Sequence, residues 1–254
     1  MRIAVQTRPW GVDRNRDDLT GILAEIAGAG YDGFEIGNQH LDLAQPDRLR
    51  TLADAHGLGI AGIHAGGEIS DPDAIKRARA QIERIADFIV AVGASIMPFS
   101  GQPKPDKSST ELQTEADNLN MVGELCAKRG VTLCYHNHNW EIADDCAELQ
   151  FLMAHTDPAL VSLCLDVGWV QRAGDDPLAV VNRFASRIAY FHLKDTTADD
   201  WRELGRGEVD LPPLLAAVKA LAPAWATVEQ DTVPGPAVDS ARISRAYLHQ
   251  RMGW

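Results

Sequence analysis

Four side chains that can bind a metal ion lie at the ends of four apolar, strand-like runs in the second half of the sequence. They are Glu141 in CYHNHNWE, Asp166 in LCLDVGW, His192 in YFHLKD and Glu229 in TVEQD. Successive members are 25, 26 and 37 residues apart, as successive strand–helix units would space them. Three carboxylates and one imidazole at one point would repel one another and lose hydration unless a divalent cation held them. The pattern predicts a metal centre, and therefore an enzyme.

The ligand types indicate which metal such a centre would hold. A set rich in carboxylates with one imidazole suits Mn²⁺ best, and Co²⁺, Mg²⁺ and Zn²⁺ are also compatible. Two residues, Glu141 and His138, are candidates for the ligand from the fifth strand. Glu141 comes three residues after His138, so a turn or bulge must re-aim it. If the strand simply continued, His138 would be the better ligand.

Other polar and aromatic side chains near strand ends can serve a substrate. His136 and His138 lie two apart on one strand, so they share a face and can act as substrate ligand or proton shuttle. The alternative is a pair of hydrogen-bonded core histidines. For Lys194 the alternative to a substrate contact is neutralisation of Asp195. We expect substrate contacts, each with packing or a salt bridge as its structural alternative, from His64, Glu35, Lys194, Trp169 and Trp10.

Short apolar runs alternate with longer amphipathic ones along the whole chain. Strands are predicted at 3–7, 33–36, 59–64, 94–98, 131–137, 161–166, 188–193 and 225–229. Helices are predicted near 17–29, 46–56, 72–92, 109–129, 146–155, 176–185, 211–221 and 237–250. Eight βα units of about 30 residues predict an α/β fold, a single-domain (βα)8 TIM barrel over residues 1–254. An open doubly wound sheet is disfavoured because no G-x-G-x-x-G follows the first strand.

Local signals support the predicted helix boundaries. Ser108 with Glu111 fits a capping box at the start of a helix. Several helical runs are followed by a glycine, the residue that most easily adopts the left-handed conformation of a helix C-terminus. These glycines are Gly30, Gly57, Gly93 and Gly130.

Composition excludes some classes of partner. The formal net charge of −12 argues against nucleic acid and anionic membranes, which require basic surfaces. No apolar stretch approaches the roughly 18 residues needed to cross a bilayer, and the N-terminus lacks the features of a signal peptide. The four cysteines form no C-x-x-C pair. We expect reduced, mostly buried thiols in a cytoplasmic protein.

The motifs YHNHNWE, LDVGW, FHLKD and VEQD, in this order and spacing, resemble those of the xylose-isomerase-like barrel superfamily, widely called sugar phosphate isomerases/epimerases. The resemblance spans essentially the whole chain. It implies a TIM barrel that binds a divalent metal through Glu141, Asp166, His192 and Glu229. It also implies a small-molecule sugar or cyclitol substrate and is compatible with a homo-oligomer.

Two branches of this superfamily are similar to the chain. Ketose 3-epimerases share the Glu–Asp–His–Glu set, and their two glutamates also move protons. They usually carry a histidine three residues after the metal aspartate, where this chain has Trp169. Inosose dehydratases and related lyases acting on 3-keto-sugars look similar in the HLKD segment, the LGRGEVDLP stretch and the EQD ending. Those enzymes often use a histidine base, which His136 or His138 can supply.

All these activities begin with removal of a proton from a carbon beside a carbonyl. A divalent metal stabilises the enediolate charge that develops, and a carboxylate or imidazole takes the proton. We expect isomerisation or epimerisation of a keto-sugar or cyclitol, with Glu141 and Glu229 exchanging protons and His136 or His138 assisting. Inosose-type dehydration or β-elimination from a 3-keto-glycoside is the alternative reaction.

Three functions outside this class are weighed against the enzyme. A non-catalytic sugar-binding barrel is the non-enzyme alternative. A related barrel that cuts abasic DNA would need a basic groove, which the charge of the chain disfavours. A phosphate-binding barrel would need backbone amides after the last strands, but residues 232–236 (TVPGP) supply prolines there. An unphosphorylated substrate is therefore favoured.

Overall fold

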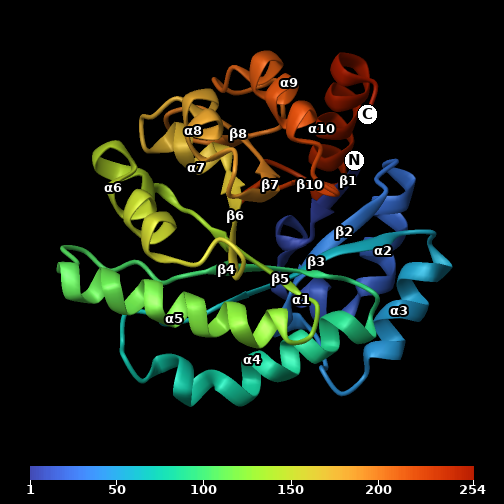
Figure 1. Ribbon diagram of the computed structural model, residues 1–254. Coiled ribbons are helices and arrows are strands. Elements are labelled where there is room, and N and C mark those ends of the chain that lie inside the picture. The colour runs from blue at the N-terminus through green and yellow to red at the C-terminus, as the bar shows by residue number, and fades with distance from the viewer.

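The computed structural model describes residues 1–254, in which eight parallel strands close into a barrel (Figure 1). The hydrogen-bonded order is β1-β10-β7-β6-β5-β4-β3-β2, and the pairing of Arg2 with Trp225 begins the contact between β1 and β10 that closes it. The (βα)8 TIM barrel predicted from the sequence is confirmed. The strands are β1 Arg2–Gln6, β2 Gly33–Gly37, β3 Gly59–Gly66, β4 Ile96–Ser100, β5 Thr132–His136, β6 Val161–Asp166, β7 Ile188–Leu193 and β10 Trp225–Val228.

Helices follow the barrel strands and cover the outside of the barrel (Figure 1). Two short helices, α1 and α7, were not predicted, and the loop after β7 contains an unpredicted antiparallel pair, β8 (Asp195–Thr196) with β9 (Trp201–Arg202). The helices are η1 Arg8–Trp10, α1 Gly11–Asp17, α2 Leu19–Gly28, η2 Asn38–His40, α3 Pro46–Ala55, α4 Ala74–Ala91, α5 Ser109–Ala127, α6 Asn139–His155, α7 Val167–Arg172, α8 Pro177–Phe184, α9 Leu211–Leu221 and α10 Ala237–Met252.

The local signals at helix ends act as predicted. The Ser108 hydroxyl accepts from the Glu111 amide at 3.3 Å, and Glu111 Oε2 accepts from the Ser108 amide at 2.8 Å. Each of the four predicted glycines has positive φ, between 65° and 83°. The α5 capping box and the glycine-terminated helices therefore fix where these connections turn toward the next strand.

The apolar core has two layers. The large one lies between the barrel and the surrounding helices, and the small one fills the inside of the barrel with Ala4, Ala61, Ile96, Cys134, Cys164, Tyr190 and Trp225. A Cβ at Gly33 or Gly59 would approach the Trp225 ring within 2.8 Å, so these glycines make room for the indole that fills the N-terminal end. Polar side chains are therefore left to the opposite end, where the strands terminate.

Two further predictions concern membranes and cysteines. No helix of the structure combines the length and apolar character required to cross a bilayer. All four cysteines are buried and none is in a disulfide, as predicted.

Candidate metal centre and active site

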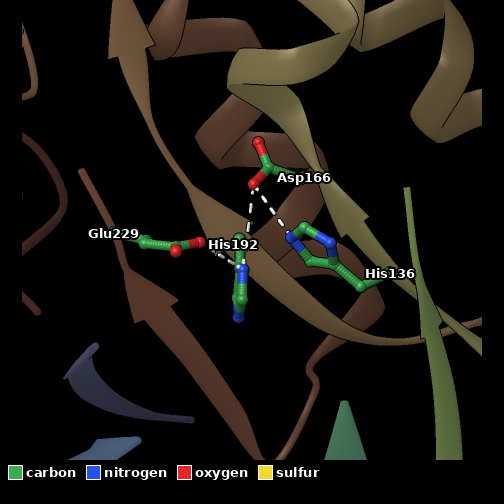
Figure 2. Close-up of side chains that lie close together, drawn as sticks. All are labelled: His136, Asp166, His192 and Glu229. Carbon is green, nitrogen blue, oxygen red and sulfur yellow. Dashed lines mark hydrogen bonds and ion pairs between the residues drawn. The ribbon is translucent and has the colours of Figure 1, made fainter. Parts of the chain in front are cut away.

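Four buried side chains converge at the C-terminal end of the barrel (Figure 2). They are His136 at the end of β5, Asp166 at the end of β6, His192 on β7 and Glu229 directly after β10. Their candidate ligand atoms all lie within 4.8 Å of one another. Since the four strands are successive neighbours in the barrel, their ends bring these residues to one point. This His/Asp/Glu group could bind a divalent metal ion.

The contacts inside the group fit a metal ion. His136 Nε2 lies 3.1 Å from Asp166 Oδ2, and His192 Nδ1 lies 2.6 Å from Glu229 Oε2. Both His192 Nδ1 and Glu229 Oε2 are buried and lack a well-formed hydrogen bond. Buried polar atoms without partners are costly, and a cation between a nitrogen and a carboxylate oxygen would satisfy both. Two imidazoles and two carboxylates are ligands that Mn²⁺, Co²⁺ and Zn²⁺ accept.

A buried lysine balances the carboxylates of this group. Lys194 Nζ lies 2.9 Å from Asp166 Oδ2, 3.1 Å from Glu229 Oε2 and 2.7 Å from Asp231 Oδ2. Burial raises the pKa of Asp166, but Lys194 and the neighbouring histidines outweigh it, so this pKa lies below its usual value. The pKa of Glu229 is lowered in the same way, by Lys194 first and then His192. Both carboxylates are therefore charged near neutral pH.

The predicted alternative for Lys194, a pairing with Asp195, is wrong. The Asp195 carboxylate instead accepts hydrogen bonds at 2.8–3.1 Å from the backbone amides of Thr196, Gly205, Gly207 and Val209. Side chains alternate along an extended strand, so Asp195 faces away from Lys194 and organises the loop that follows β7.

Glu141 does not join the group, contrary to its prediction as a metal ligand and proton carrier. Strand β5 stops at His136, and Glu141 lies in the first turn of α6. Its Oε2 accepts from the His138 amide at 2.7 Å, and its Oε1 accepts from the Tyr135 hydroxyl at 2.7 Å. Burial raises the pKa of Glu141 to about 7, although these two hydrogen bonds oppose the rise. Glu141 therefore caps a helix, and His136 takes the place beside Asp166.

His138 lies beside the group and faces the cavity above it. Its ring stacks on Trp140 with centroids 4.3 Å apart, and it lies 4.8 Å from the ring of His136. Its Nδ1 has no hydrogen-bond partner. Burial, followed by the proximity of His136, lowers the pKa of His138 to about 2, so the imidazole is neutral. The ring also lines the cavity, so a molecule bound there would contact this imidazole.

A cavity of about 750 Å³ opens above the group. Most of its lining is polar, including Gln6, Asn38, His64, Ser100, Glu229 and Asp231. The nearby Arg8 is already paired with Asp231 at 3.2 Å. Hydroxyl groups would find donors and acceptors on these walls, which is the character of a site for a polyhydroxylated molecule.

The other predicted substrate residues are distributed differently. His64 lines the cavity, whereas Glu35 is fully buried below it and contacts His64 and His192. Trp169 lies in an aromatic group, 5.5 Å from His138 and 4.7 Å from Trp201 between ring centroids. Trp10 is not brought to the cavity, because its Nε1 donates to Glu25 at 2.6 Å.

Comparison with known proteins defines the family. The sequence matches the model of the xylose isomerase-like TIM barrel over residues 23–250. The chain belongs to this family. A curated relative, the inosose dehydratase of Geobacillus thermodenitrificans (strain NG80-2), is 28% identical over 267 residues, which cover 91% of this chain and 89% of that protein.

Solved structures share the fold. An L-ribulose 3-epimerase superposes with a TM-score of 0.83 at 19% identity, covering 99% of this chain and 94% of the other. The probable 3-DHS dehydratase AsbF from Bacillus anthracis superposes with a TM-score of 0.82 at 17% identity, covering 99% and 100%. The family fold therefore accommodates epimerases and dehydratases on the same barrel.

Several residues of the site were missed from the sequence, among them Gln6 and Asn38 in the cavity wall. Ser100 was overlooked because the fourth strand was predicted to end at 98, two residues before β4 ends. Asp231 lies two residues after Glu229, so on an extended strand the two share a face, and this alternation was the signal for its contact with Lys194. Trp140 has no strand position, and only the fold of the β5–α6 turn stacks it on His138.

Proposed function

We propose that this chain is a divalent-metal-dependent enzyme that removes a proton from the carbon beside the carbonyl of an unphosphorylated keto-sugar or cyclitol. His136, Asp166, His192 and Glu229 would hold the metal. When bound there, the metal would supply a positive charge that stabilises the developing negative charge on the substrate oxygen. Support comes from the polar cavity directly above these residues and from the sugar-converting activities of the relatives.

The side chains of the cavity divide the remaining work. The His138 imidazole lines the cavity and is placed to accept the proton from the substrate carbon. Lys194 holds Asp166 and Glu229 in their charged forms and also contacts Asp231, so these carboxylates keep fixed positions. His64 and Gln6 line the wall and are placed to bind substrate hydroxyl groups.

One observation favours dehydration over epimerisation. An epimerase with two carboxylates needs one on each face of the reacting carbon, but Glu141 is withdrawn into the start of α6. Glu229 and the His138 imidazole both line the cavity, whereas Asp231 is already paired with Lys194 and Arg8. An imidazole in place of the second carboxylate favours dehydration, the activity for which the inosose dehydratase relatives are named. Epimerisation or isomerisation remains the second candidate, favoured by the fold shared with L-ribulose 3-epimerase.

Deuterium exchange tests the shared chemistry without knowledge of the final product. The purified protein is incubated in D₂O with Mn²⁺ and a panel of keto-sugars and inososes, and NMR follows deuterium at the carbon beside the carbonyl. We expect exchange or product with at least one substrate, abolished by EDTA and by His138→Ala. The proposal is contradicted, and a sugar-binding barrel favoured, if ligands bind but no exchange or product appears with any divalent metal.

A further inference from the structure

Polar side chains from six successive strands, β2 to β7, form a closed ring of contacts around the candidate metal centre. Three members, from β2, β3 and β4, lie outside the group of His136, Asp166, His192 and Glu229, and the other three belong to it. The first half of the ring runs from Glu35 Oε1 to His64 Nδ1 at 3.1 Å, from His64 Nε2 to Ser100 Oγ at 2.8 Å, and from Ser100 Oγ to His136 Nδ1 at 3.3 Å. The second half runs from His136 Nε2 to Asp166 Oδ2 at 3.1 Å and from Asp166 Oδ2 to His192 Nδ1 at 3.8 Å. The contact of His192 Nε2 with Glu35 Oε2 at 2.9 Å closes the ring.

The Glu35 carboxylate determines where the protons of this ring lie. It is fully buried and contacts a ring nitrogen of His64 and one of His192. Its two oxygens face these nitrogens at 3.1 Å and 2.9 Å, so each oxygen of the carboxylate is placed to accept a hydrogen bond from one imidazole. An ionised carboxylate can only accept hydrogen bonds. His64 Nδ1 and His192 Nε2 must therefore both carry protons.

The constraint passes from Glu35 to the other side of the ring. With Nδ1 protonated, a neutral His64 has an acceptor at Nε2, so the Ser100 hydroxyl donates its single proton there. Ser100 Oγ is then the acceptor for His136, whose Nδ1 must carry the proton. With a cation bound between them, His136 Nε2 then offers its lone pair on the side that faces Asp166 Oδ2, 3.1 Å away; without the cation this nitrogen would donate to the carboxylate.

We propose that Glu35 and Ser100 are positioning residues that fix the tautomers of His136 and His192, so that both present a lone pair to the same metal ion. Glu35 acts on His192 directly and on His136 through His64 and Ser100. The proposal rests on the metal centre proposed above but assigns a role to strands β2 and β4, which carry none of its ligands. A partner on the outer nitrogen of a ligating histidine orients the ring and strengthens metal binding.

Two substitutions break the ring at different points. Glu35→Gln presents one accepting oxygen and one donating nitrogen, so one of the two histidines must change its tautomer. Ser100→Ala removes the link to His136 and leaves Glu35 untouched. We expect isothermal titration calorimetry to show Mn²⁺ affinity lowered roughly 10–100-fold by either change. The matched control is Gln6→Ala, because Gln6 also donates to Glu35 Oε1, at 3.2 Å, but has no tautomer to set. We expect the Mn²⁺ affinity of the Gln6→Ala protein to stay within about threefold of the native affinity.

The tautomers themselves provide a second readout, which for His64 needs no metal. Long-range ¹H–¹⁵N spectra of the metal-free protein should place the proton of His64 on Nδ1. With diamagnetic Zn²⁺ bound, the proton of His136 should also lie on Nδ1, and Ser100→Ala should weaken this preference. If the native protein binds no divalent metal, the proposed metal centre is wrong, but these spectra still show whether the ring of hydrogen bonds sets the histidine tautomers.

The proposal is overturned if folded Ser100→Ala and Glu35→Gln proteins bind Mn²⁺ within about twofold of the native affinity. It is also overturned if His64 in the metal-free native protein carries its proton on Nε2 and not on Nδ1. Circular dichroism establishes folding, and Ser100→Ala alone decides the outcome if Glu35→Gln does not fold.

Discussion

Buried carboxylates lie in the β5–α6 turn and at the ends of β6 and β10, but only those at the two strand ends reach the candidate metal centre. Asp166 is the last residue of β6 and Glu229 directly follows β10, so the barrel register brings both to its axis. Glu141 comes five residues after the end of β5 and bonds the backbone of its own turn. The difference teaches that distance from the strand end, rather than residue type, decides whether a carboxylate reaches the centre.

The largest effect should follow from Asp166→Asn. Asn keeps an oxygen for the Gly168 and Trp169 amides, which Asp166 Oδ1 accepts at 3.0 Å, so α7 should still form. The substitution removes the anionic oxygen that faces His136 and Lys194. We expect Mn²⁺ affinity to fall on the order of 1000-fold, about 4 kcal/mol, by calorimetry. Native-like affinity in a folded variant would remove Asp166 from the centre.

The next largest effect concerns the counter-ion of these carboxylates. Lys194→Met leaves Asp166, Glu229 and Asp231 buried together without their cation. We expect the free energy of unfolding in EDTA to fall by about 3 kcal/mol, since a buried charge loses its partner. Mn²⁺ should recover part of this loss. Urea denaturation with and without metal measures both, and an unchanged free energy in EDTA would contradict the account.

The β5–α6 turn should show its role through pH. The pKa of Glu141 is about 7 in the folded protein, against an ordinary value of 4.5. Between these values the folded state binds more protons, so the contribution of Glu141 to stability falls as pH rises from about 4.5 to 7. Glu141→Gln removes this dependence. Urea denaturation at pH 5 and 8 should show the variant gaining roughly 1–3 kcal/mol on the native protein over that interval. A constant difference would contradict the assignment.

The smallest effect comes from a capping box far from the centre. Ser108→Ala removes the hydroxyl that accepts from the Glu111 amide at the start of α5. We expect a loss of about 1 kcal/mol in the free energy of unfolding, typical of a lost N-cap. Mn²⁺ affinity should stay unchanged, which makes this variant a control for general destabilisation.

Features that depend on a regular spacing of residues along the chain could be predicted from the sequence. Alternation and spacing were enough for the eight strands, and the end positions of Asp166 and His192 followed because side chains two apart on a strand share a face. Glu229 followed from the same reasoning. The α5 capping box at Ser108 was also legible, because it consists of residues three apart in one turn.

The sequence misled where a strand ended early. Glu141 stands three residues after His138, which is capping-box spacing, and this signal was available but was interpreted as a re-aimed ligand. The role of His136 depends on β5 stopping there, and a one-residue shift would turn it to the other face. The contacts of Glu35 and Ser100 join strands far apart in the chain, so only the closed barrel brings them together.

Metal binding by Glu229→Gln and Glu141→Gln, compared in one calorimetric series, tests the central claim most directly. Both changes replace a buried glutamate by its amide, but only Glu229 lies in the group with His136, Asp166 and His192. We predict that Glu229→Gln loses Mn²⁺ affinity by roughly 100-fold or more, while Glu141→Gln stays within about threefold of the native protein. Equal losses in the two variants, or a loss confined to Glu141→Gln, would contradict the account.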